Sequence, residues 1–212
     1  MQGWAAARRA GPLLPVKGNV FIVCKIEGDH KWCNSREFIE GSACVRVYVA
    51  STYFELGHFR EAAEHVIRTL GHAPEMLNAL DGLSDEAVVA ELRRRVGLCD
   101  CVVVVVGLGR GSTPKMTGLE DSSFTAVEYE TASRHQLPIL VFHVRGKTKS
   151  IRGDLPFDIQ AAIRSENVWV ERFKETQLNT HVIKVLEHVE EFQAALAAAL
   201  IQLESVRKDS AG

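Results

Sequence analysis

Five consecutive valines, Val102–Val106, constrain the fold of this chain more than any other stretch of its sequence. The run has neither the period of an amphipathic helix nor the alternation of a strand with one exposed face. Strands that are covered on both faces have such sequences, and they are typical of the centre of parallel sheets. We therefore predict a parallel sheet with helices on both of its faces.

Strand and helix patterns alternate from Val45 onward. The predicted strands are residues 45–50, 72–77, 101–107, 138–144 and 167–173. Between and after them we predict helices at 51–71, 83–100, 122–135, 157–165 and 181–206. Thr52 with Glu55 forms a capping-box pattern for the first helix, Gly71 ends it, and Ser84 is the expected N-cap of the second. This order predicts an α/β three-layer sandwich whose five parallel strands have the flavodoxin-like order 2-1-3-4-5.

The domain boundaries follow from the same alternation. Residues 1–42 lie outside it, and we interpret them as a leader that is disordered or adds an edge strand. Residues 43–207 form the predicted α/β domain, and residues 208–212 a tail.

Composition excludes several classes of protein. With 25 basic and 27 acidic residues, the chain lacks the basic footprint of a nucleic-acid-binding protein. Its five cysteines are odd in number and irregular in spacing, which fits a reducing compartment better than a disulfide framework. No apolar run approaches the roughly 18 residues that span a membrane. Cys24, His30 and Cys33 match no common zinc spacing, so we expect a cytoplasmic protein without a metal site.

A ligand site is expected where strand order reverses, beyond the carboxyl ends of the first and third strands. The loop 50–53 supplies hydroxyls and helix N-terminal amides there, which suit an anionic or hydroxyl-rich ligand. The loop 107–112 supplies backbone amides beside glycines and a guanidinium that could hold a phosphate. The predicted binding residues are Ser51, Thr52, Tyr53, Gly107, Arg110, Gly111 and Thr125. Each feature also has a structural explanation, since the hydroxyls can cap a helix, the glycines can form a turn and the arginine can be a surface residue.

The predicted helix 122–135 places one carboxylate on its apolar face. Helical spacing groups Phe124, Val127, Glu128, Thr131, Ala132 and His135 on that face. Glu130 points the other way. If Thr125 is the N-cap, Glu128 completes a capping box and contacts a backbone amide. If the helix begins near Ser122 or Ser123, Glu128 lies one turn in, and burial raises its pKa.

Three stretches carry a resemblance to a known family: VRVYVASTYFELGHFREAA, CDCVVVVVGLGRGS and SFTAVEYETASRHQLPILVF. Together they resemble the family catalogued as domain of unknown function 4062, over roughly residues 45–203. That family is a TIR-like, flavodoxin-like module, usually at the N-terminus of bacterial multi-domain signalling or STAND-type ATPase proteins. The chain departs from the family pattern at Ala50, where a serine is usual, and at Gly109, where an aromatic residue is common.

The T-x-x-E motif that opens the helix after the third strand is similar to the catalytic position of nucleoside 2-deoxyribosyltransferases and of NAD-cleaving TIR domains. By position, that glutamate is Glu128. The resemblance implies cleavage or exchange of an N-glycosidic bond in a signalling or bacterial-defence setting, with NAD as the leading candidate substrate and no required cofactor.

Two alternatives remain open. The chain could be a non-catalytic interaction or sensor module that self-associates, or leads to a downstream domain, through its long C-terminal helix. It could also be a domain that senses a nucleotide without cleaving it.

Overall fold

The computed structural model describes residues 44–52, 56–77, 82–107, 109–144, 170–178, 181 and 183–211. The predicted leader 1–42, the helix predicted at 157–165, and Tyr53 lie outside these described residues.

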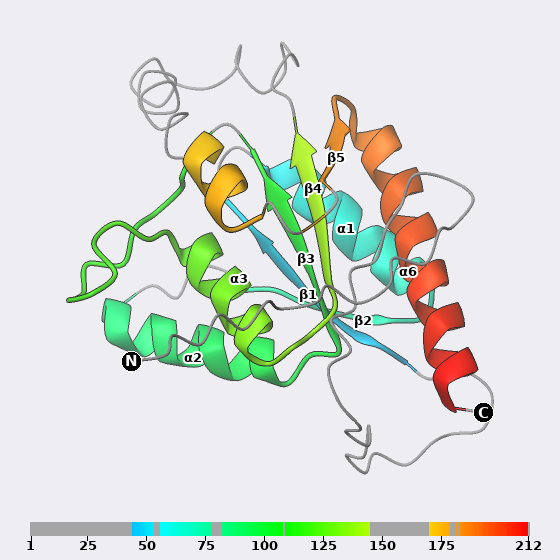
Figure 1. Ribbon diagram of the computed structural model, residues 1–212, viewed down its shortest axis with the longest axis horizontal. Coiled ribbons are helices and arrows are strands. Elements are labelled where there is room, and N and C mark those ends of the chain that lie inside the picture. The colour runs from blue at the N-terminus through cyan, green and yellow to red at the C-terminus, as the bar shows by residue number, and fades with distance from the viewer. Residues whose placement is uncertain are drawn as a thin grey trace, which may run out of the picture.

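A five-stranded parallel sheet in the order β2-β1-β3-β4-β5 forms the centre of the molecule (Figure 1). Its strands are β1 (Arg46–Ser51), β2 (Ala73–Glu75), β3 (Cys101–Val106), β4 (Ile139–Val144) and β5 (Ile183–Leu186). All six residues of β3 are buried, as the valine run predicts. The predicted architecture and strand order are confirmed.

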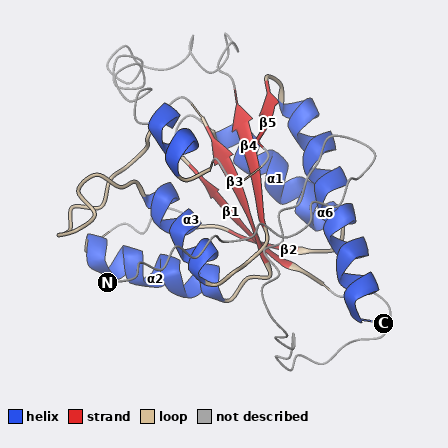
Figure 2. Cartoon of the chain, viewed as in Figure 1, coloured by secondary structure: helices blue, strands red, loops and turns tan. Residues whose placement is uncertain are grey.

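Helices cover both faces of the sheet (Figure 2). On one face lie α1 (Gly57–Thr69) and α6 (Val189–Ala211). On the other lie α2 (Asp85–Gly97), α3 (Phe124–Arg134) and a helical segment over residues 170–176. α6 ends at Ala211, so it includes most of the segment 208–212 that we predicted as a tail.

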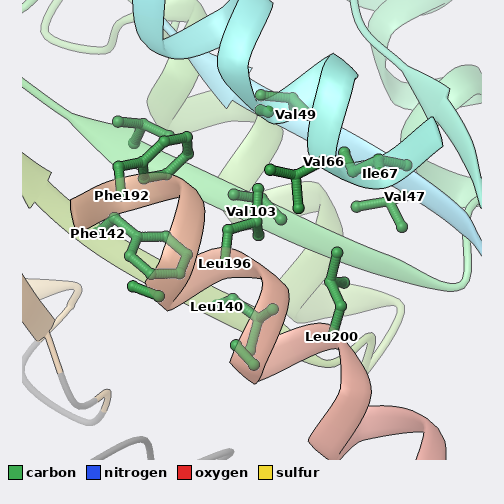
Figure 3. Close-up of a cluster of buried hydrophobic side chains, with 14 of the residues drawn as sticks. Val47, Val49, Val66, Ile67, Val103, Leu140, Phe142, Phe192, Leu196 and Leu200 are labelled. Carbon is green, nitrogen blue, oxygen red and sulfur yellow. The ribbon is translucent and has the colours of Figure 1, made fainter. Parts of the chain in front are cut away.

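The pleat of the strands divides the core into two layers. Val47 and Val49 of β1 pack toward α1 and α6, where Phe142 and Phe192 meet edge to face with ring centroids 5.2 Å apart (Figure 3). Tyr48 and its alternate neighbours on β3 and β4 pack toward α2 and α3 instead. The three central strands, β1, β3 and β4, are therefore covered on both faces, as is typical of a parallel sheet.

Two helix ends follow the sequence signals. The amide of Gly71, with φ of 79°, donates to Arg68 O, and that of His72 donates to Ile67 O, which is a Schellman motif. Ser84 caps α2 by accepting from Ala87 N at 3.3 Å.

The start of α1 differs from the prediction. The N-cap of α1 is Leu56, with no side-chain cap hydrogen bond, so Thr52 does not cap the helix.

The fifth strand was assigned to the wrong segment. Residues 170–173 of the predicted strand 167–173 belong to the helical segment 170–176, because Val170 and Phe173 at i, i+3 spacing are buried against the layer that contains Tyr48. The strand is β5, at the start of the predicted helix 181–206, where Leu186 is buried and Val185 is exposed. Short apolar segments fit both periods, and the tertiary contacts decided between them.

Candidate functional site

Glu128 is buried against the sheet from the second turn of α3. The helix begins one residue after Ser123, whose hydroxyl accepts from Ala126 N at 3.1 Å, so the capping box with Thr125 as N-cap is wrong. Glu128 is 5% exposed, whereas the side chain of Glu130 is 37% exposed and pairs with Arg134. The helix thus separates two nearby carboxylates into a buried group and a solvent-facing one.

Tyr48 holds one oxygen of that buried carboxyl group. Tyr48 lies in the middle of β1 and is fully buried, and its hydroxyl donates to Glu128 Oε1 at 2.7 Å. Among the described residues, no donor contacts the second oxygen, Oε2. Sequence reasoning missed Tyr48, although a tyrosine in an otherwise aliphatic strand is itself a signal, because a buried hydroxyl needs a partner.

Arg60 ties three parts of the site edge together from α1. Its guanidinium donates to Ser51 O at 3.2 Å, to Ser51 Oγ at 3.1 Å and to Leu77 O at 2.9 Å. It is 6% exposed, and its positive charge acts on Glu128. Sequence reasoning missed Arg60 as well. The available signal was its place on the apolar stripe of the helix, four residues after Leu56.

The electrostatics of this group are dominated by burial. Burial raises the pKa of Glu128 to about 8, and the hydrogen bond from Tyr48 and the charge of Arg60 lower it by less. Burial, and then the nearby Glu128, raises the pKa of Tyr48, which keeps its hydroxyl a donor. In the ligand-free protein at neutral pH, Glu128 is therefore mostly a neutral acid that a bound cation would ionise.

The two loops predicted to meet do so at Thr52 and Gly111. Gly111 has φ of 76°, and a Cβ on it would lie 2.5 Å from Thr52 Cγ2. Glycine is therefore required at position 111 both for its backbone conformation and for the close approach. Gly107 is buried at the end of β3, where this loop begins.

Arg110 has a structural role. Its Nη2 donates to Glu120 O at 2.9 Å and to Ser122 O at 3.0 Å, which fixes the segment before α3. The amide of Phe124 adds a bond to Ser112 O at 3.1 Å. The prediction that Arg110 holds a phosphate stays a prediction.

The remaining predicted binding residues are buried or half-buried. Ser51 and Thr125 are each 8% exposed, and the Ser51 hydroxyl is engaged by Arg60. Thr52 lies half-buried at the carboxyl edge.

The described residues can be searched for metal ligands and membrane-spanning helices, whereas Cys24, His30 and Cys33 lie outside them. The described residues contain no group of three His, Cys, Asp or Glu side chains that could hold a metal ion. Cys99 and Cys101 are buried, and burial raises the pKa of both thiols. Within the described part of the chain, no helix has the length and apolarity needed to cross a membrane.

A separate hollow of about 250 Å³ lies at the opposite end of the strands. It is lined by Arg46, Glu75, Arg94, Arg95 and Leu98. Glu91 accepts from both Arg94 and Arg95 at 2.7 Å, so these two arginines are paired with a carboxylate of their own helix.

Comparison with known proteins places this fold in a family. No curated protein matches the sequence. The family model described as Domain of unknown function (DUF4062) matches residues 46–201, which include every described strand and most of α6. The chain therefore belongs to the DUF4062 family.

Proposed function

We propose that this chain binds a nucleotide and cleaves or exchanges its N-glycosidic bond, with NAD as the first substrate to test. The observation that carries the proposal is the buried Glu128 carboxyl group, which Tyr48 holds from the middle of β1 and which lies one turn into α3, the helix that starts at the carboxyl edge of the sheet. Ligands of open parallel sheets bind at that edge.

The chemistry uses the two oxygens of Glu128 differently. Cleavage of an N-glycosidic bond passes through a transition state that resembles an oxocarbenium ion. With Oε1 fixed by Tyr48, Oε2 is the oxygen that faces C1′, where its charge stabilises the cation or attacks it. Nicotinamide leaves NAD as a neutral molecule, so this step needs an ionised carboxylate rather than an acid. The positive charge of the bound nicotinamide ring lowers the pKa of Glu128 and favours that form.

The proposal fixes the pH dependence of turnover. Because only ionised Glu128 is active, kcat/KM for NAD should rise with pH, about tenfold per pH unit, and level off near the free-enzyme pKa of about 8. A profile that is flat, or that falls over this range, would contradict the carboxylate role.

The direct test is nicotinamide release from NAD by wild type, Glu128→Gln and Glu130→Gln. The first variant removes the buried charge and the second the exposed one two residues away. We expect at least a hundredfold loss for Glu128→Gln and little change for Glu130→Gln. Equal rates for wild type and Glu128→Gln would overturn the assignment.

We infer a second candidate function, a non-catalytic interaction module, from apolar side chains that remain exposed. Ile201 on α6 is 52% exposed, and Val185 on β5 is 44% exposed on the face of the sheet opposite α6. Such side chains suit self-association or a downstream domain of a STAND-type protein. Light scattering across protein concentration, with Ile201→Lys as the comparison, tests it. A wild-type mass that stays monomeric at every concentration argues against self-association.

A further inference from the structure

An uncommon pair of side chains lies at the end of β4. His143 is 8% exposed, and its Nε2 lies 3.4 Å from the Nζ of Lys174 in the helical segment 170–176. A lysine ammonium has donors alone, so in this contact the imidazole is the acceptor, at Nε2. The Lys174 side chain is 14% exposed, and its other partner is Glu171 at 2.6 Å.

This pair lies on the same face of the sheet as Glu128 and its partner Tyr48. His143 is paired in register with Val106, the last residue of β3. It also alternates with Ile139 and Val141, which pack in the same core layer as Tyr48. The pair therefore lies at the carboxyl edge of the sheet, on the side that α3 covers.

The helix that carries Lys174 is fixed to α3 beside the candidate carboxyl group. The Tyr129 hydroxyl donates to Gln177 O at 2.6 Å, and the Tyr129 ring meets that of Phe173 edge to face with centroids 5.8 Å apart. Tyr129 directly follows Glu128, so one short stretch of α3 positions both the carboxyl group and the lysine.

The surroundings of Lys174 favour an anionic ligand. The Lys174 side chain is largely removed from water, its imidazole partner brings no negative charge, and its carboxylate partner Glu171 has a side chain that is 53% exposed. Glu171 supplies one opposite charge, and an anionic ligand would supply a second acceptor, because an ammonium group has three donors. Arg110, the cation predicted to hold phosphate, is engaged by two backbone carbonyl groups.

We propose that Lys174, oriented by His143, is the cation that binds the phosphate groups of the nucleotide. A phosphate oxygen accepts a charge-assisted hydrogen bond from Nζ, while the imidazole keeps the ammonium directed toward the edge of the sheet. The nucleotide identity of this ligand rests on the proposed function, whereas the preference for an anion rests on the contacts of Lys174.

Calorimetric binding of ADP and of adenosine, which lacks the phosphates, tests the inference in the full chain. Lys174→Met keeps most of the apolar stem and removes the charge, and Lys174→Arg keeps the charge. Lys208→Ala is the matched control, because Lys208 is an exposed lysine in the last turns of α6. Thermal melts of each variant establish that it is folded.

Wild type should bind ADP more tightly than adenosine. Lys174→Met should weaken ADP binding about tenfold or more, with adenosine unchanged, while Lys174→Arg and Lys208→Ala stay within a few-fold of wild type. Unchanged ADP affinity in Lys174→Met, equal loss for both ligands, or no binding of ADP by wild type would overturn the inference.

The inference and the proposed function fail separately. If Glu128→Gln leaves NAD turnover unaltered while ADP binding depends on Lys174, the proposed cleavage fails and the phosphate site stands. If NAD is cleaved in a way that depends on Glu128 but ADP affinity is independent of Lys174, the phosphate site fails and the proposed cleavage stands.

Discussion

Replacing Glu128 by Gln should change how stability depends on pH. The folded protein raises the pKa of Glu128 from 4.5 to about 8, so the folded state retains a proton that the unfolded chain releases. The unfolded state therefore binds fewer protons in this window, and stability falls as pH rises from 4.5 toward 8. At about 1.4 kcal/mol for each pKa unit, and with half of the carboxyl groups ionised at pH 8, the loss by pH 8 is roughly 4 kcal/mol.

The glutamine variant removes this titration and keeps an acceptor for the Tyr48 hydroxyl. We expect Glu128→Gln to match wild type in urea unfolding at pH 5 and to exceed it by roughly 4 kcal/mol at pH 8. Other titrating groups act on both proteins and cancel in the difference. Glu130→Gln, whose carboxylate faces solvent beside Arg134, should show no such divergence. Parallel profiles for wild type and Glu128→Gln would refute the reasoning that burial dominates at this site.

Two further predictions concern other parts of the fold. Gly111→Ala should destabilise the protein by more than the roughly 1 kcal/mol expected for Gly118→Ala, because both glycines have positive φ but a Cβ at position 111 alone meets Thr52. Urea midpoints check this, and equal losses would contradict the contact. Burial lowers the pKa of His72, whose Nε2 lies 3.1 Å from Glu204, so the folded state resists protonation and stability should drop as pH falls below 6.5. In His72→Gln, the free energy of unfolding should therefore fall less between pH 7.5 and pH 5 than it does in wild type. The same fall in both proteins would contradict this role of His72.

The sequence predicts the sheet well because its strongest signals are unambiguous. A run of five valines has no interpretation as a surface helix, and the alternation of strands and helices leaves few strand orders. The orientation of Glu128 was equally accessible, since helical spacing alone separates it from Glu130.

The segment after β4 could not be assigned in the same way. The valines and phenylalanine of residues 167–173 suit a strand, and β5 carries a pattern that suits the start of a helix. In both cases the available space on the sheet, which no local pattern encodes, decided the outcome. The same holds for the main contact of the site, because Tyr48 meets Glu128 across 80 residues of sequence.

The strand order has a consequence for the way in which the chain folds. The amide of Arg46 at the start of β1 bonds Asp100 at the start of β3 across 54 residues, and Tyr48 bonds Glu128 across 80. Parallel pairing of this kind closes long loops before burial of the strands can compensate for the lost chain entropy. Assembly of the central strands, rather than formation of any single helix, therefore carries most of the entropic barrier to folding.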